Sequence, residues 1–229
     1  MGYAALMMVL FAANFWLWTN AGDAGPSGGP LTLDGPPEPP SAREAEGLLR
    51  DLAVEPASPM AGYSRGEFPL WAEAAASGWA GADDACDARE MTLQRDAWSV
   101  EVWTDDCSVA DGEWLDPYTG EILRDPSGVA VDHVVSLAEA WRSGASGWSA
   151  ERRERYTNAP GVLLAVAAEA DRAKGEKGPG AWKPPKRGYR CEYARRWISI
   201  KSGWGLSADA AERDALGEML EACGAKETS

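Results

Sequence analysis

The only histidine of this sequence, His133, limits the chemistry that the protein can perform. Sites that need several imidazoles are excluded, among them the three-histidine zinc centre and the two-histidine iron site. A single imidazole has an unperturbed pKa of about 6.5 and can act as a general base near neutral pH. Any imidazole chemistry must therefore take place in the segment VDHVV that contains His133.

Two carboxylates and one amide are spaced along the chain so that they could complete a site around this histidine. Asp132 precedes the histidine, Asn158 follows in RYTNAPG, and Asp171 lies in AEADRAKGE. Carboxylates suit Mg²⁺, which accepts few protein ligands and keeps several waters. An amide can orient an imidazole through its second ring nitrogen. A base, cation ligands and an orienting group are what phosphodiester hydrolysis requires.

Short helices and strands must position these groups, and their order indicates an α+β fold. Asp132 and His133 are neighbours on a predicted strand, so a strand end or a bulge is needed for both side chains to reach one site. The predicted strands are 98–103, 129–135 and 162–166, with a hairpin at 112–123. The predicted helices are 41–54, 67–76, 137–141, 149–156, 193–204 and 207–222.

Charge is distributed unevenly along the chain. The 229 residues carry a net charge of −14, which argues against a protein that coats polyanions over its whole surface. Residues 171–201 nevertheless contain ten basic and three acidic residues, a net charge of +7. Aromatic residues are interleaved with these cations, and the stretch follows the candidate site directly. This pattern favours a face that contacts phosphates.

Several segments together resemble a known family. The segments are VDHVVSLAEAW, ERRERYTN, LLAVAAEADRAKGE, AWKPP and CEYARRW, and upstream GYSRGEF, CDAREMTLQRD and GEWLDPYTG. They resemble the secreted bacterial HNH-endonuclease-like proteins of the His-Me finger (ββα-metal) superfamily, which include proteins similar to the GmrSD C-terminal domain. The resemblance covers residues 63–223.

The resemblance implies a ββα-metal core embedded in additional helices and a small antiparallel sheet. It makes His133 the general base. It makes Asp132 and Asp171 the ligands of a divalent cation, Mg²⁺ in the first place and Mn²⁺ as the alternative. Asn158 would orient the imidazole or brace the loop. The family usually has Asn where this chain has Asp171, and Pro where it has Ser136.

Four basic residues are candidates for binding the substrate. The resemblance places Lys174 close to the phosphate, and Arg172 is two residues before it. Arg65 and Arg89 lie in upstream segments that resemble the family, and either bind phosphate or form internal ion pairs.

Glu139 is expected to be a solvated helix position rather than a metal ligand. Four tryptophans are expected in the core rather than as platforms for bases: Trp141, Trp148, Trp182 and Trp197.

The N-terminal region predicts export. Residues 1–20 contain a short apolar run typical of a signal peptide or an uncleaved N-terminal anchor. Residues 21–42 are rich in Gly and Pro and indicate a linker. The nuclease-like domain is then 43–225. We expect a secreted protein, or one whose domain lies outside the membrane and which contacts it only through residues 1–20.

The four cysteines agree with export, because an even number behind an export signal suggests disulfides. Three pairings are possible. We favour Cys86–Cys107 and Cys191–Cys223, since each closes a local loop. Each bond would then stabilise the domain by about 3–4 kcal/mol in the chain-entropy model.

These features predict an exported, metal-dependent endonuclease that hydrolyses DNA, with RNA as a second candidate substrate. No helix-turn-helix or zinc-finger pattern is visible, so little sequence specificity is expected. No stable protein partner is implied. The alternative is a secreted, disulfide-stapled binding or cell-surface module that kept the fold and lost catalysis.

Overall fold

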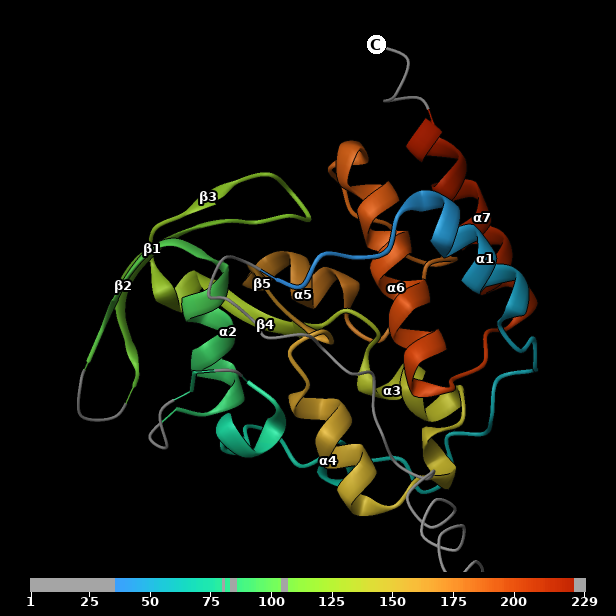
Figure 1. Ribbon diagram of the computed structural model, residues 1–229, viewed down its shortest axis with the longest axis horizontal. Helices are drawn as coiled ribbons and strands as arrows, with labels where there is room; N and C mark the ends of the chain where they lie inside the picture. The colour runs from blue at the N-terminus through green and yellow to red at the C-terminus, as the bar shows by residue number, and fades with distance from the viewer. Residues whose placement is uncertain (1–35, 80, 83–85, 104–106, 225–229) are drawn as a thin grey trace, which may run out of the picture.

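The computed structural model describes residues 36–79, 81–82, 86–103 and 107–224. The fold is α+β (Figure 1). Its helices are α1 (Ala42–Asp51), α2 (Ala88–Asp96), α3 (Leu137–Arg142), α4 (Ala150–Asn158), α5 (Ala168–Lys174), α6 (Arg190–Trp204) and α7 (Ala210–Gly224). Its strands are β1 (Ala97–Val102), β2 (Val109–Leu115), β3 (Ile122–Leu123), β4 (Val129–His133) and β5 (Leu163–Ala167).

The strands form two small antiparallel sheets. One has the order β1-β2-β3, and the other pairs β4 with β5 in a register that sets His133 opposite Leu163. Every residue of β5 is buried, and α5 begins directly after it. Figure 1 shows β4, β5 and α5 between the three-stranded sheet and the helices α1, α6 and α7. The two-stranded sheet therefore lies inside the molecule, and its pairing fixes the position of the end of β4.

Side-chain caps fix where the helices begin. Ser41 and Glu44 form a complete capping box at α1, and Ser136 and Ser149 cap α3 and α4. Asp87 caps α2.

Five predicted helices are confirmed within a few residues: 41–54, 137–141, 149–156, 193–204 and 207–222. The predicted strands and the predicted hairpin are confirmed as well.

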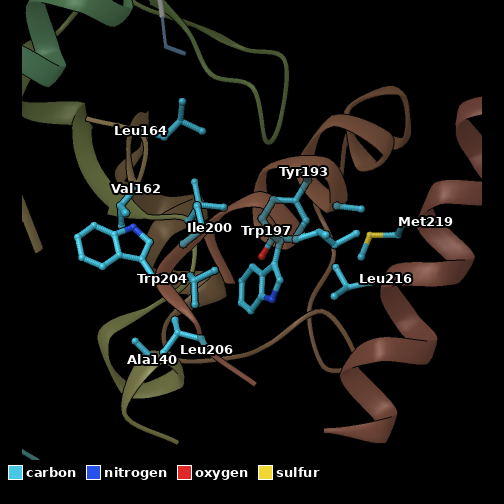
Figure 2. Packing of buried hydrophobic residues seen from close by; sticks show 14 of the residues in the cluster. Ala140, Val162, Leu164, Tyr193, Trp197, Ile200, Trp204, Leu206, Leu216 and Met219 are labelled. Carbon is cyan, nitrogen blue, oxygen red and sulfur yellow. The ribbon is translucent and has the colours of Figure 1, made fainter. Parts of the chain in front are cut away.

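The largest apolar cluster is built around α6. Tyr193, Trp197 and Trp204 point from this helix toward Leu216 of α7 and Val162 before β5 (Figure 2). Trp141 and Trp197 are buried, and Trp148 and Trp182 pack partly buried against the same cluster, so the expectation that these four tryptophans belong to the core is confirmed. This packing joins the helical side of the molecule to the two-stranded sheet.

Helix α2, which the sequence did not predict, holds β5 in place. Arg95 is buried and donates hydrogen bonds to the carbonyls of Leu163 and Pro160. Asp96 pairs with Arg95 and accepts from the backbone N–H of Ala165. The start of β5, which faces His133 in the sheet, is therefore fixed by a buried ion pair.

Part of the basic stretch at 171–201 is used inside the fold, so these cations do not contribute to the phosphate-contacting face that the sequence predicts. The Lys201 ammonium is fully buried between Glu139 and Glu212, at 2.9 and 2.6 Å. Arg195 and Arg196 bind backbone carbonyls of residues 37–40. The described end of the predicted linker thus lies against α6. Charges that serve these contacts are not available to a polyanion.

Both predicted disulfides are confirmed. Cys86–Cys107 joins the segment before α2 to the β1–β2 connection, and Cys191–Cys223 joins α6 to α7. No cysteine of the described residues is free.

The predicted helix at 67–76 is wrong. Only short 3₁₀ turns form, at Arg65–Glu67 and Ala75–Ser77. Pro69 lacks an N–H and drives the preceding Phe68 into an extended conformation. Between the turns, Trp71 adopts a left-handed φ of 59°.

The segment 1–20 and most of the predicted linker lie outside the described residues. Within the residues that the structure does describe, no helix has the length and apolar character that a membrane span needs.

Candidate active site

His133 is the last residue of β4, and its side chain is buried beside the end of α4. Its Nε2 lies 2.9 Å from the backbone carbonyl of Thr157. A carbonyl oxygen can only accept, so we assign the proton to Nε2, which leaves Nδ1 with a free lone pair. Desolvation lowers the pKa of His133 to about 4, against the opposing effects of the Thr157 carbonyl and Asp132. The imidazole is therefore neutral at pH 7 and can accept a proton at Nδ1.

Asp132 is held by two buried partners. The Tyr118 hydroxyl donates to one carboxylate oxygen at 2.6 Å, and the Lys174 ammonium donates to the other at 2.8 Å. Tyr118 comes from the turn between β2 and β3 and is fully buried. The sequence DPYTG predicts only a turn. The hydrogen bond from Tyr118 to Asp132 could not be predicted from it, because the fold brings these two segments together.

Lys174 is not placed to touch a substrate, which corrects the expectation that it lies close to the phosphate. Its side chain is 0% exposed. Its ammonium donates to Asp132 and, at 2.9 Å, to the backbone carbonyl of His133. Lys174 therefore fixes the end of β4 through these two buried hydrogen bonds.

Asp171 lies on α5, and its carboxyl is close to that of Asp132. Burial and, after it, the negative charge of Asp132 raise the pKa of Asp171 to about 6. The structure thus brings the two acidic residues together, and one of them, Asp132, directly precedes the only histidine on β4. Asp171 lies within the helix and does not cap it, since the N-cap is Ala167.

The other cations differ in their relation to the site. Arg65 is exposed, and its positive charge makes a small contribution to lowering the pKa of both His133 and Asp171. Arg172 is exposed on α5 next to Asp171. Arg89 pairs with Glu90 on α2. Arg65 and Arg172 are therefore the exposed cations among the four candidates that lie nearest to the aspartates in charge effect or in sequence.

Asn158 is fully buried and braces a loop. Its side-chain amide donates to the carbonyls of Pro69 and Glu154, at 3.0 and 2.8 Å, and its oxygen accepts from the N–H of Ala72 at 3.0 Å. Both amide hydrogens are used in these bonds, and the imidazole is oriented by Thr157 instead.

Glu139 is not a solvated helix position, because its side chain is only 12% exposed. Its carboxylate pairs with Lys201 and Arg142 and accepts from the Ser143 hydroxyl. The expectation of a solvated position is wrong, because Lys201 of α6 reaches α3 in the fold.

Comparison with known proteins identifies the relatives of this chain. The family model for the C-terminal domain of GmrSD restriction endonucleases matches residues 89–219. The chain belongs to this family. A protein of Arthroderma benhamiae, described as an uncharacterized secreted protein, is 40% identical over 196 residues, which are 85% of this chain and 92% of the relative. No solved structure matches.

The GmrSD C-terminal family match begins at Arg89 and ends in α7. It includes His133, Asp132, Asp171 and Asn158, whereas Arg65 lies before it. The prediction of a nuclease-like family is confirmed. The relative is fungal, so proteins of this kind are not confined to bacteria.

The donor set of this GmrSD C-terminal domain fits a hard divalent cation. Asp132 and Asp171 offer adjacent carboxylates, and each carboxylate can accept more bonds than it makes here. Across the described part of the chain, no three His, Cys, Asp or Glu side chains group as a metal site. A cation that keeps several of its own waters, such as Mg²⁺, is the one that two carboxylates suit.

Replacing Asp171 with Asn, the usual family residue, should stabilise the cation-free protein at pH 8 but not at pH 4. The pKa of Asp171 is raised in the folded state, so folding favours its protonated form, and this contribution is lost as pH rises through about 6. Because Asp171 is half-exposed, screening reduces the expected gain at pH 8 to about 1 kcal/mol. Urea unfolding in EDTA at both pH values measures it. An equal effect at both would show that the pKa of Asp171 is not raised in the folded protein.

Proposed function

We propose that this protein is an exported endonuclease that hydrolyses phosphodiester bonds of DNA with the help of a divalent cation. One observation carries the proposal. Asp132, which directly precedes the only histidine on β4, lies close to Asp171 of α5, the His133 imidazole is neutral, and the charge of the exposed Arg65 acts on both His133 and Asp171. Membership of a family of restriction endonuclease domains supports a nucleic-acid substrate.

We further propose that β4, β5 and α5 are the ββα-metal core expected from the sequence. The two strands are antiparallel, the helix follows the second strand directly, and the histidine ends the first strand. This arrangement supports the assignment, because it puts one acidic residue on the first strand and the other on the helix. Asp132 and Asp171 would hold Mg²⁺, or Mn²⁺ in its place.

In this proposal, each residue of the site has a separate role in hydrolysis. The Nδ1 of His133 takes the proton of the attacking water, while the Thr157 carbonyl holds Nε2–H and keeps the ring in the required tautomer. The bound cation supplies polarisation of the phosphate and stabilisation of the leaving oxygen. Lys174 and Tyr118 position Asp132. Arg65 binds the phosphate, and Arg172 binds the neighbouring backbone.

We also propose that the protein cleaves with low sequence specificity and that it is exported. Arg65 and Arg172 are exposed cations that the proposal assigns to substrate binding, and the described residues contain no helix-turn-helix or zinc finger, so contacts would go to the phosphate backbone. The relative described as secreted and the two disulfides support an extracellular location. No stable protein partner is needed for this activity.

The experiment is digestion of supercoiled plasmid, linear DNA and RNA by purified protein in Mg²⁺, Mn²⁺, Ca²⁺ or Zn²⁺, each with an EDTA control. We expect plasmid to be nicked and degraded in Mg²⁺ and to remain intact in EDTA, because the two carboxylates act through the cation. Equal digestion in excess EDTA would contradict the role of the cation. No digestion with any of the four metals would favour the inactive binding module instead.

A further inference from the structure

The backbone of Trp71 is in a conformation that a bulky residue rarely adopts. Among the non-glycine residues that the structure describes, two have a positive φ, Trp71 at 59° and Cys107 at 63°. Cys107 is held by its disulfide. Trp71 has no covalent constraint of that kind, so its conformation must be maintained by the contacts of its loop.

The indole of Trp71 lies against the imidazole of His133. The two ring centroids are 6.2 Å apart and the planes are inclined by 27°, which is a stacked arrangement. Trp71 also packs on the apolar cluster that contains Trp79, Cys86 and Leu163. One side of the histidine ring is thus covered by an aromatic side chain from a segment about sixty residues earlier in the chain.

The loop that carries Trp71 is fixed on both sides of this residue. Asn158 binds Pro69 on one side and Ala72 on the other, at 3.0 Å each. The carbonyl of Ala72 also accepts from the N–H of Ala88 at 3.1 Å. The Trp79 indole N–H donates to the Asn158 carbonyl at 3.0 Å. These bonds bracket the strained residue and hold its ring on the histidine.

We propose that Trp71 is a positioning residue that holds the His133 imidazole in its reactive orientation. The inference rests on the proposed function, because it assigns a task to the base of that reaction. Thr157 fixes the rotation of the ring in its own plane through Nε2, and Trp71 limits its tilt through the ring face. Asn158, the neighbour of Thr157 at the end of α4, acts on the imidazole through Trp71. Two adjacent residues therefore orient the base, one directly and one through the loop.

The test compares Trp71→Phe, which keeps an aromatic ring, with Trp71→Leu, which keeps apolar bulk and loses the ring. Both variants retain a side chain at the strained position, so their stabilities should be similar. Trp98→Leu is the control, because Trp98 lies on β1 with 62% of its surface exposed. The readouts are kcat and KM for a small chromogenic phosphodiester in Mg²⁺, the unfolding midpoint, and the two imidazole C–H proton signals of tag-free protein.

We expect Trp71→Leu to lower kcat about 10-fold with little change in KM, because a small misplacement of a catalytic group slows the chemical step. Trp71→Phe should keep most of the activity. Only His133 contributes imidazole signals, so their shift in Trp71→Leu, with no shift in Trp98→Leu, would report loss of the stacked ring without reference to activity. Equal kcat for the Leu and Phe variants with unmoved imidazole signals would overturn the proposal. If the wild type cleaves nothing, the proposed function fails, while the signals still decide whether the Trp71 ring lies on the imidazole.

Discussion

Substitution of His133 by alanine is expected to lower the rate of plasmid cleavage by about 10³-fold in Mg²⁺, within the range usual for loss of a general base. The chain has no second histidine that could take over the proton. The variant should remain folded, because the main polar interaction that it removes is one hydrogen bond to the Thr157 carbonyl, which contributes about 1 kcal/mol. Cleavage rates and the unfolding midpoint are measured on the same preparations.

Two further measurements separate a chemical defect from a structural one. Free imidazole can enter the space left by the side chain, so it should restore part of the activity of His133→Ala and have no such effect on the wild type. A variant that keeps cleavage within tenfold of the wild type would show that another group removes the proton. A loss of activity that follows the unfolded fraction would show that the effect is structural.

Replacement of Lys174 by methionine is expected to destabilise the protein by about 3–5 kcal/mol at neutral pH, because it leaves the buried carboxylate of Asp132 without its cation. Lys174 is 0% exposed and Asp132 is 5% exposed, so the pair is buried and loss of the ammonium leaves the carboxylate poorly solvated. Urea unfolding gives the free energy. The double variant Lys174→Met, Asp132→Asn should recover a large part of the stability, because it removes the unpaired charge as well.

Lys177→Met is a matched control in the same region of the chain. Its ammonium is exposed and binds only the carbonyl of Ala173 among the described residues, so the change should cost less than about 0.5 kcal/mol. If Lys174→Met were equally harmless to stability and weakened only DNA binding, the assignment of Lys174 as an internal partner would be wrong. Its role as a phosphate contact would then be restored.

The sequence predicted the site best where residue type alone limits the chemistry. A single histidine left one position for a base, and carboxylates that flank it in a family-like order suggested which acids would join it. The β4–β5 pairing and the start of α5 then bring Asp171 to Asp132. The disulfides were predictable because each closes a short loop between elements that lie side by side.

Tertiary contacts explain what the sequence did not predict. From the sequence, Lys174 and Lys201 would be taken for surface charges. Their neighbours in the chain do not show that Asp132, Glu139 and Glu212 surround them in the fold. Tyr118 reaches Asp132 from a hairpin turn. The sequence analysis predicted a helix at 67–76, but Pro69 and the bonds from Asn158 fold this segment as a loop.

Binding of Mn²⁺ to tag-free protein, followed through the proton signals of the only histidine, tests most directly whether a cation binds between Asp132 and Asp171 beside His133. Mn²⁺ is paramagnetic and broadens nearby protons. We predict that it broadens the imidazole signals of the wild type at concentrations that support cleavage, and that Asp171→Ala requires much more Mn²⁺ for the same effect. Sharp imidazole signals at Mn²⁺ concentrations that sustain full cleavage would contradict a cation site at these two carboxylates.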